Sequence, residues 1–471
     1  MNWLVFWIAV YLLIIAYLTI RHVKVKNVEA YLVNNRKTKT LPLVFTTLAT
    51  FVGGGTSIGL MAMGYESGFA AVGIGIAYVI GFFILSKFAG KIRQEGFENK
   101  IYSFPHYLIH KYIKDKNSNI SRLFTSSVSG INIFIFFFLL AAQFVGMASL
   151  LKFAFGIEYQ MAAIISCLIV IGYTAIAGLS GVILTDMIQF FAIIIMIVLI
   201  FIPGIMADTA NLNLLDKLPK TFLNGSFYGW SFLIALPLFL APSVLVRLDI
   251  WQRLLAAQDK KTARKMSIYS GLGMLPFYII FPLVGMAIHL VMPGQIEPKD
   301  VTYLFIERHA NSFLLGFAVI GLISALMSSG DSFLNLISIS AVNDFRTGKN
   351  KLSPKQMQPK IRIATLIFGV IATVISLIFP KIVDLMVVGI GTIVIFVPAT
   401  FLALKNKKVS SYQNLAVFSI LSGFIVNLAF FILGIVQPET FEPKSSFIPA
   451  FLTATAVLII GYFYKKNKYG H

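Results

Sequence analysis

Thirteen apolar runs, each close to the length of a membrane-crossing helix, are the feature that most constrains this fold. A helix that crosses about 30 Å of hydrocarbon needs roughly 20 apolar residues. The runs lack the strict apolar–polar alternation of β-barrel strands, so helices are the expected spanning form. We therefore expect an all-α polytopic membrane protein whose spans are residues 3–20, 41–64, 69–88, 123–151, 157–177, 181–205, 228–246, 267–292, 312–341, 361–380, 382–404, 412–435 and 447–464.

The composition supports this class. Hydrophobic residues make up 58% of the chain and charged residues only 12%, whereas soluble domains carry about 25% charged residues. A soluble enzyme, a nucleic-acid-binding protein and a disordered protein are therefore disfavoured. The single cysteine, Cys167, lies in an apolar run, which excludes an intramolecular disulfide and a cysteine-based metal site.

The basic residues predict the orientation in the membrane. A signal peptide would require a positively charged residue before its apolar run, and no Lys or Arg precedes the first run here. We therefore expect this span to be retained. With the N-terminus outside and the C-terminus in the cytoplasm, the outer segments hold few of the 39 basic residues, as the positive-inside rule demands. Those few are Lys152, Lys217, Lys220, Lys299, Arg308, Lys381 and Lys444. The predicted location is the plasma or inner cell membrane, with the lipid bilayer as partner.

Two spans contain interruptions of the helical backbone. Span 41–64 contains three adjacent glycines, and span 228–246 contains Pro237 and Pro242. Each span opens a block of five, and the two blocks run in opposite directions through the membrane. This arrangement is typical of transporters, whose substrates bind at such breaks. We therefore expect one transporter domain over 1–471, with inverted repeats at about 41–206 and 228–404 and peripheral helices at 3–20, 412–435 and 447–464.

Two acidic residues, Asp186 and Asp331, lie well inside predicted spans. No Lys or Arg inside a span is expected to pair with them, so each acid must be protonated, hydrogen-bonded or balanced by a bound cation. Helical spacing places Ser328, Asp331 and Ser332 on one face, where hard oxygen ligands suit a small cation. Alternatively, the serines bond to the carbonyls of their own helix.

Several segments resemble the sodium:solute symporter family, which has a LeuT-like inverted-repeat fold. Residues 325–329, Ala-Leu-Met-Ser-Ser, are similar to the sodium motif Ala-x-x-Ser-Ser of that family. The resemblance covers essentially the whole chain. It implies that sodium is bound by the carbonyls of Ala49, Val52 and Ala325 and by the hydroxyls of Ser328 and Ser329.

Two further segments carry the resemblance. Residues 185–189, Thr-Asp-Met-Ile-Gln, resemble a Thr-Asp-x-x-Gln segment that helps to hold a second ion in some members. This implies a possible second cation site at Asp186, Asp331 and Ser332. Residues 252–257 resemble the Gln-Arg-x-x-Ala-Ala segment, for which we expect a structural role at the cytoplasmic end of span 228–246.

The expected function is sodium-coupled import of a small organic solute by alternating access. The residues expected to line the solute site are Gly53, Thr56, Ser57, Leu60, Leu240 and Ser243. Positions that carry an amide and a carboxylate in sugar-transporting relatives read Thr56 and Gly75 here, so a partly apolar or carboxylate-bearing solute is favoured over a sugar. Sodium is the expected coupling ion. We expect no catalytic residue, organic cofactor, nucleic acid or obligate protein partner.

Two alternatives remain open from the sequence. One is a proton-coupled symporter on the same fold, with Asp186 and Asp331 as the proton-carrying groups. The other is a transporter-like sensor that signals solute occupancy.

Overall fold

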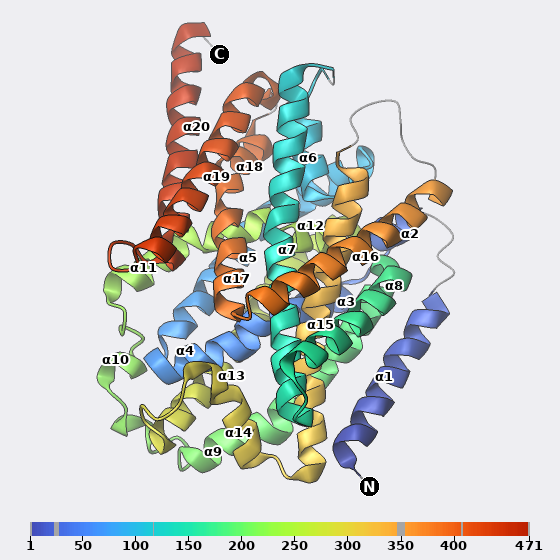
Figure 1. Cartoon of the computed structure of the whole chain (residues 1–471). Helices are drawn as coiled ribbons and strands as arrows, with labels where there is room; N and C mark the ends of the chain where they lie inside the picture. The colour runs from blue at the N-terminus through green and yellow to red at the C-terminus, as the bar shows by residue number, and fades with distance from the viewer. Residues whose placement is uncertain (1, 23–27, 116, 346–353, 407, 470–471) are drawn as a thin grey trace.

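The computed structural model describes residues 2–22, 28–115, 117–345, 354–406 and 408–469, and the regular structure of these residues is helical (Figure 1). Within them, 11 helices are long and apolar enough to cross a membrane, or up to 13 if each of two bent pairs is one span. The predicted all-α polytopic fold is confirmed, and its thirteen spans correspond to the upper of these two counts.

The α-helices of the described residues range from 4 to 38 residues in length. The N-terminal half contains α1 (Trp3–His22), α2 (Val28–Val33), α3 (Thr40–Phe51), α4 (Leu60–Ser67), α5 (Ala70–Glu98), α6 (Phe104–Tyr112), α7 (Asn119–Phe155), α8 (Tyr159–Met196), α9 (Ile202–Asp208) and α10 (Lys220–Leu223). The C-terminal half contains α11 (Trp230–Phe239), α12 (Leu248–Ala256), α13 (Lys260–Val291), α14 (Val301–His309), α15 (Ser312–Asn343), α16 (Pro354–Ile378), α17 (Ile382–Ile393), α18 (Val397–Lys405), α19 (Gln413–Val436) and α20 (Phe447–Tyr469).

Helix α15 lies at the centre of the molecule. It packs against α7, α8, α16 and α1, and its side chains from Leu322 to Leu336 are almost all buried. Helices α19 and α20 pack mainly against each other (Figure 1). They present many apolar side chains outward. Because a bilayer solvates apolar surface, this outward apolar character fits a protein surrounded by lipid.

Two helix pairs are bent, one at its predicted interruption and the other after it. The segments Thr40–Phe51 and Gly55–Ser67 meet at 60°, across the triple glycine, and the second begins with a π-helical turn, Gly55–Gly59. The segments Trp230–Val246 and Leu248–Ala256 meet at 49°.

The second bend differs in place from the prediction. Pro237 lies inside α11 and Pro242 begins a 3-10 segment, Ala241–Val246, whereas the change of direction comes after it, at Arg247. The predicted span 228–246 ends where the first of these two segments ends, and α12 follows after the bend. Helix α12 forms the second half of the broken span, and its residues from Leu248 to Ala256 are all buried.

The start of α3 is fixed beside the end of α12. The Thr38 N–H donates to the Ala256 carbonyl at 3.1 Å, and the Gln258 N–H donates to the Thr38 carbonyl at 3.0 Å. The buried Arg36 guanidinium donates to the Leu255 carbonyl at 3.2 Å. These contacts hold the two broken spans side by side, so that side chains of α12 reach α3.

Candidate functional site

The break after α3 leaves main-chain groups available for ligands. The Val52 N–H donates to the Leu48 carbonyl at 3.0 Å and closes the helix. Among the described residues, the carbonyls of Ala49 and Val52 accept no backbone N–H, and the N–H groups of Gly53 and Gly55 donate to no partner. Inside a membrane such groups need another ligand.

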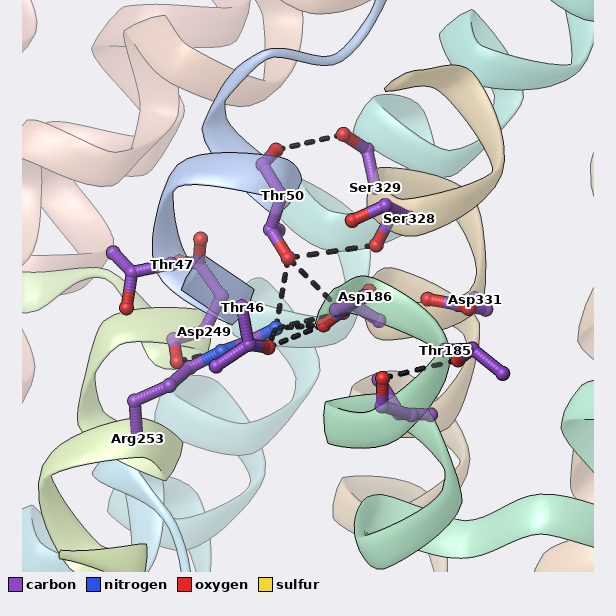
Figure 2. Close-up of polar contacts among 12 residues, drawn as sticks. Thr46, Thr47, Thr50, Thr185, Asp186, Asp249, Arg253, Ser328, Ser329 and Asp331 are labelled. Atoms are coloured by element: carbon purple, nitrogen blue, oxygen red, sulfur yellow. Dashed lines mark hydrogen bonds and ion pairs between the residues drawn. The ribbon is translucent and has the colours of Figure 1, made fainter. Parts of the chain in front are cut away.

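Helix α15 faces this break. The Ser329 hydroxyl donates to the Thr50 carbonyl at 2.7 Å and lies 3.3 Å from the Ala325 carbonyl (Figure 2). A Cβ atom on Gly53 would lie 2.2 Å from the Ser329 Oγ, so glycine is what permits this approach. The carbonyl that Ser329 contacts on α3 is thus that of Thr50, which was not among the predicted ligands and lies between Ala49 and Val52.

The Ser328 hydroxyl is buried and has no hydrogen-bond partner among the described residues. A cation with hard oxygen ligands would satisfy such a buried, unpartnered hydroxyl and any unused carbonyl within its reach. The donor set fits sodium. That Ala49, Val52, Ala325, Ser328 and Ser329 bind it together remains a prediction.

Arg253, from α12, extends between α3 and α8 to the predicted acid Asp186 (Figure 2). Its Nη2 lies 3.3 Å from the Asp186 Oδ2 and donates to the hydroxyls of Thr50 and Ser332, each at 2.8 Å. The Thr46 hydroxyl also donates to Asp186. The side chains of Arg253 and Asp186 are 1% and 0% exposed.

The expectation that no buried basic residue accompanies the two acids is therefore wrong. Its cause is that residues 248–256, expected at the cytoplasmic end of span 228–246, form a helix that is buried in the protein. A guanidinium contacts two of the three residues predicted for the second cation site, Asp186 and Ser332. The second cation site itself stays a prediction.

Asp331, the third residue of that set, has a different environment. The Tyr173 hydroxyl of α8 donates to its Oδ2 at 2.5 Å, and its Oδ1 has no partner among the described residues. One turn away on α15, neither side-chain amide atom of Asn335 has such a partner. Asp331 is 0% exposed, and it forms no ion pair with any of the described residues.

The residues predicted to line the solute site lie at both breaks. The hydroxyls of Thr56, Ser57 and Ser243 each donate to a main-chain carbonyl, of Phe51, Gly53 and Leu240 respectively. The segment with Leu240 and Ser243 packs on α5, where the Ala241 carbonyl would lie 2.3 Å from a Cβ at Gly81. Leu60 is buried at the start of α4.

Three aromatic side chains line the first break. Tyr278 of α13 lies with its hydroxyl 3.4 Å from that of Thr56, and the Tyr78 ring of α5 lies 5.9 Å from the Tyr278 ring. The Phe51 ring makes an edge contact with Tyr78 at 5.5 Å, and the Arg247 guanidinium lies over Phe51 at 4.1 Å. Arg247 belongs to the second break, so this contact links the two breaks.

Comparison with known proteins now identifies the family. Residues 31–412 match the sodium:solute symporter family. The chain belongs to the sodium:solute symporter family. The match includes both broken helices, the Ser328–Ser329 pair and Arg253, so membership covers the whole of the site described above. The protein is thus a transporter-family protein and not an enzyme.

Individual relatives of this family member differ in what they carry. It is 27% identical over 325 residues to an osmoregulated proline transporter of Bacillus subtilis (strain 168), across 64% of this chain and 64% of that relative, which is just under two thirds of its length. It is 25% identical over 451 residues to high affinity choline transporter 1 of Homo sapiens, across 88% of this chain and 73% of the relative.

A solved structure establishes the fold. The substrate-bound, outward-open state of a Na⁺-coupled sialic acid symporter superimposes with a TM-score of 0.74. The superposition covers 98% of this chain and 97% of the other, at 19% sequence identity. The LeuT-like fold predicted from the sequence is therefore confirmed for this symporter-family protein.

Sequence reasoning missed several residues of this family member's site. Gln143 of α7 accepts the Gly54 N–H at 2.8 Å and so binds the break directly. Tyr173 and Tyr278 were not predicted either, because a tyrosine in an apolar span has no distinctive local signal. A polar amide in the long apolar run of α7 was a signal that could have identified Gln143.

Proposed function

We propose that this protein is a sodium-coupled symporter that imports a small solute bearing a carboxylate. The observation that carries the proposal is the contact of α3 with Ser329, whose hydroxyl donates to the Thr50 carbonyl, next to the buried Ser328 hydroxyl, which has no partner among the described residues. Bound sodium would tie α3 to α15, because its ligands come from both helices. Membership of the sodium:solute symporter family supports the choice of ion.

The free N–H groups of Gly53 and Gly55 support a carboxylate on the solute. They precede the helix that restarts at Gly55 and runs to Ser67, and helix N-termini attract anions. The aromatic rings of Phe51 and Tyr278 offer an apolar wall beside them. A relative named as a proline transporter is consistent with a solute that has both parts.

Transport would follow from relative movement of the broken helices against the remaining bundle. The proposed repeats, at about 41–206 and 228–404, would each contribute one broken helix, α3–α4 and α11–α12. Sodium would stabilise one arrangement of α3 on α15, and solute bound at Gly53 and Gly55 would stabilise the same arrangement. In this account the two ligands bind more tightly together than alone, and each raises the affinity of the other by the same factor.

Uptake into proteoliposomes tests the proposal. Purified protein would be reconstituted with an inward sodium gradient, with an equal potassium gradient as control. Radiolabelled proline, choline, sialic acid and glucose would be compared. We expect sodium-dependent uptake of the amino acid and none of the sugar glucose. Sodium-independent uptake would contradict the coupling, and uptake of choline or glucose in place of proline would contradict the carboxylate requirement.

The environment of Asp331 supports a second hypothesis, in which a further cation or a proton is coupled to transport of the solute. Its buried carboxylate has no cationic partner among the described residues, while Asp186 already contacts Arg253. A second cation near Asp331 and Ser328 would supply the missing charge, and a proton is the alternative. Uptake by an Asp331→Asn variant, measured against sodium concentration at two pH values, distinguishes these two cases.

A further inference from the structure

A cavity lies away from both broken helices. It has a volume of about 420 Å³ and is enclosed by α1, α7, α8 and α15, with Leu12, Leu151, Ile169 and Met327 among its lining residues. None of its lining residues comes from α3, α4, α11 or α12. Helix α1 covers it by packing on α8 and α15 (Figure 1).

The cavity reaches the surface that faces the bilayer. Phe155 and Ile165 line it and are each 40% exposed. Met161 and Leu168, on the same helix as Ile165, are exposed as well and carry no polar atoms that water would solvate. At the level of these apolar spans, the medium outside is hydrocarbon.

Water does not suit this cavity. Its polar lining groups are the hydroxyls of Ser166 and Tyr11. The Ser166 hydroxyl donates to the Ala163 carbonyl at 3.1 Å, and the Tyr11 hydroxyl accepts from the Gln189 amide at 3.3 Å. A buried water needs two to four polar partners, and apolar cavities of about 150 Å³ stay dry and bind hydrocarbon molecules.

We propose that this cavity binds an acyl chain of a membrane lipid. A chain entering beside Ile165 would pass between α1 and α8 and end against Ile323 and Met327 of α15. The chain would fill the empty volume and contact the helices around it. These contacts would hold α1 against the core. This inference does not depend on the proposed solute or coupling ion.

Bound lipid would also affect the polar site through Tyr11. The Tyr11 hydroxyl contacts the Met327 sulfur at 3.8 Å as well as Gln189, which lies three positions from Asp186 on α8. Helix α1 is therefore connected to the surroundings of Asp186 by Tyr11, a side chain that also lines the cavity. Loss of the chain would loosen the position of this tyrosine.

Photocrosslinking tests the site. The full-length protein would be placed in nanodiscs that contain phosphatidylcholine with a mid-chain diazirine, irradiated, and mapped by mass spectrometry. We expect adducts on Ile323 and Met327, which are only 8% and 2% exposed and are reached through the cavity. A wild-type protein without adducts on these two residues, but with adducts on the exposed Leu168, would overturn the proposal.

Two variants sharpen the result. Ser166→Phe places a ring in the cavity and should lower labelling of Ile323 and Met327 at least fivefold, while Leu168 remains labelled. Ser166→Ala removes the hydroxyl without filling the space and should label as the wild type does. Equal labelling of Ile323 in the folded Ser166→Phe protein would also overturn the proposal. Should Ser166→Phe not fold, Ile169→Phe provides the same comparison.

Discussion

The guanidinium of Arg253 and the carboxylate of Asp186 form an ion pair between residues 67 positions apart in the sequence. The pair joins α12, the second half of one broken helix, to α8, and the same nitrogen also contacts Thr50 at the end of the other broken helix. Because both side chains are at most 1% exposed, neither charge is solvated by water. This contact connects the two broken helices to the residues of the proposed cation site.

Replacing Arg253 alone should destabilise the protein more than replacing Arg253 and Asp186 together. Arg253→Gln leaves the Asp186 charge buried without compensation, which costs about 3–5 kcal/mol in proteins studied by mutation. The double variant Arg253→Gln with Asp186→Asn carries no such charge and should melt at a higher temperature than Arg253→Gln alone. Thermal unfolding of detergent-purified protein measures this difference.

Arg308→Gln is the matched control for that cycle. Arg308 pairs with the buried Asp208 at 2.9 Å, but its own side chain is 45% exposed and Asp208 keeps His309 at 2.7 Å as a second partner, so the loss of Arg308 should cost less than the loss of Arg253. A double variant no more stable than Arg253→Gln would contradict the charge-pair interpretation.

Ser328→Ala should weaken sodium binding without unfolding the protein. The Ser328 hydroxyl has no partner among the described residues, so its removal breaks no hydrogen bond of the apoprotein. We expect the sodium activation curve of uptake to shift at least tenfold to higher concentration, equivalent to about 1.4 kcal/mol. Ser338→Ala is the control, since that hydroxyl is also buried on α15 but donates to the Leu334 carbonyl at 2.7 Å. Identical sodium curves for Ser328→Ala and wild type would remove the serine from the site.

Gly53→Ala should impair sodium coupling by displacing Ser329. The new Cβ would lie 2.2 Å from the Ser329 Oγ and 2.8 Å from the Gln143 Oε1, so both side chains must rotate and lose their contacts with the break. We expect sodium-driven uptake to fall at least tenfold. Gly130→Ala, at a helical glycine whose Cβ would meet no atom within 4 Å, should transport normally. Normal uptake by Gly53→Ala would show that the close approach of α3 to α15 is not needed.

Asp331→Asn should reduce the number of coupled cations. If a second cation binds at Asp331, the Hill coefficient for sodium should fall from near two towards one, since it cannot exceed the number of sites. Tyr173→Phe removes the hydrogen bond to Asp331 but keeps the charge, and should leave the Hill coefficient unchanged. An Asp331→Asn protein that loses the pH dependence of uptake but keeps its sodium dependence would instead identify a proton site. Unchanged curves at both pH values would assign Asp331 a structural role.

The sequence by itself determined the spans and the first break. Membrane thickness requires runs of about 20 apolar residues, and this requirement acts on local composition, which is why all thirteen predicted spans correspond to helices or bent pairs. The triple glycine at 53–55 likewise marks a break because backbone freedom is a property of the residues themselves. The Ser328–Ser329 pair was recognisable for a related reason, as a local motif on one helix.

Only the tertiary structure decided which polar groups meet. Arg253 was expected at the cytoplasmic end of its span, because residues 247–257 contain no local signal that the chain turns by 49° and continues through the protein interior. Gln143 meets Gly54, and Tyr173 meets Asp331, because packing of α7, α8 and α15 brings distant segments together. The apolar cavity likewise requires four helices. Hydropathy specifies that a segment is buried in the membrane, but the direction of a bend and the partner of a buried charge depend on the packing of all neighbouring helices.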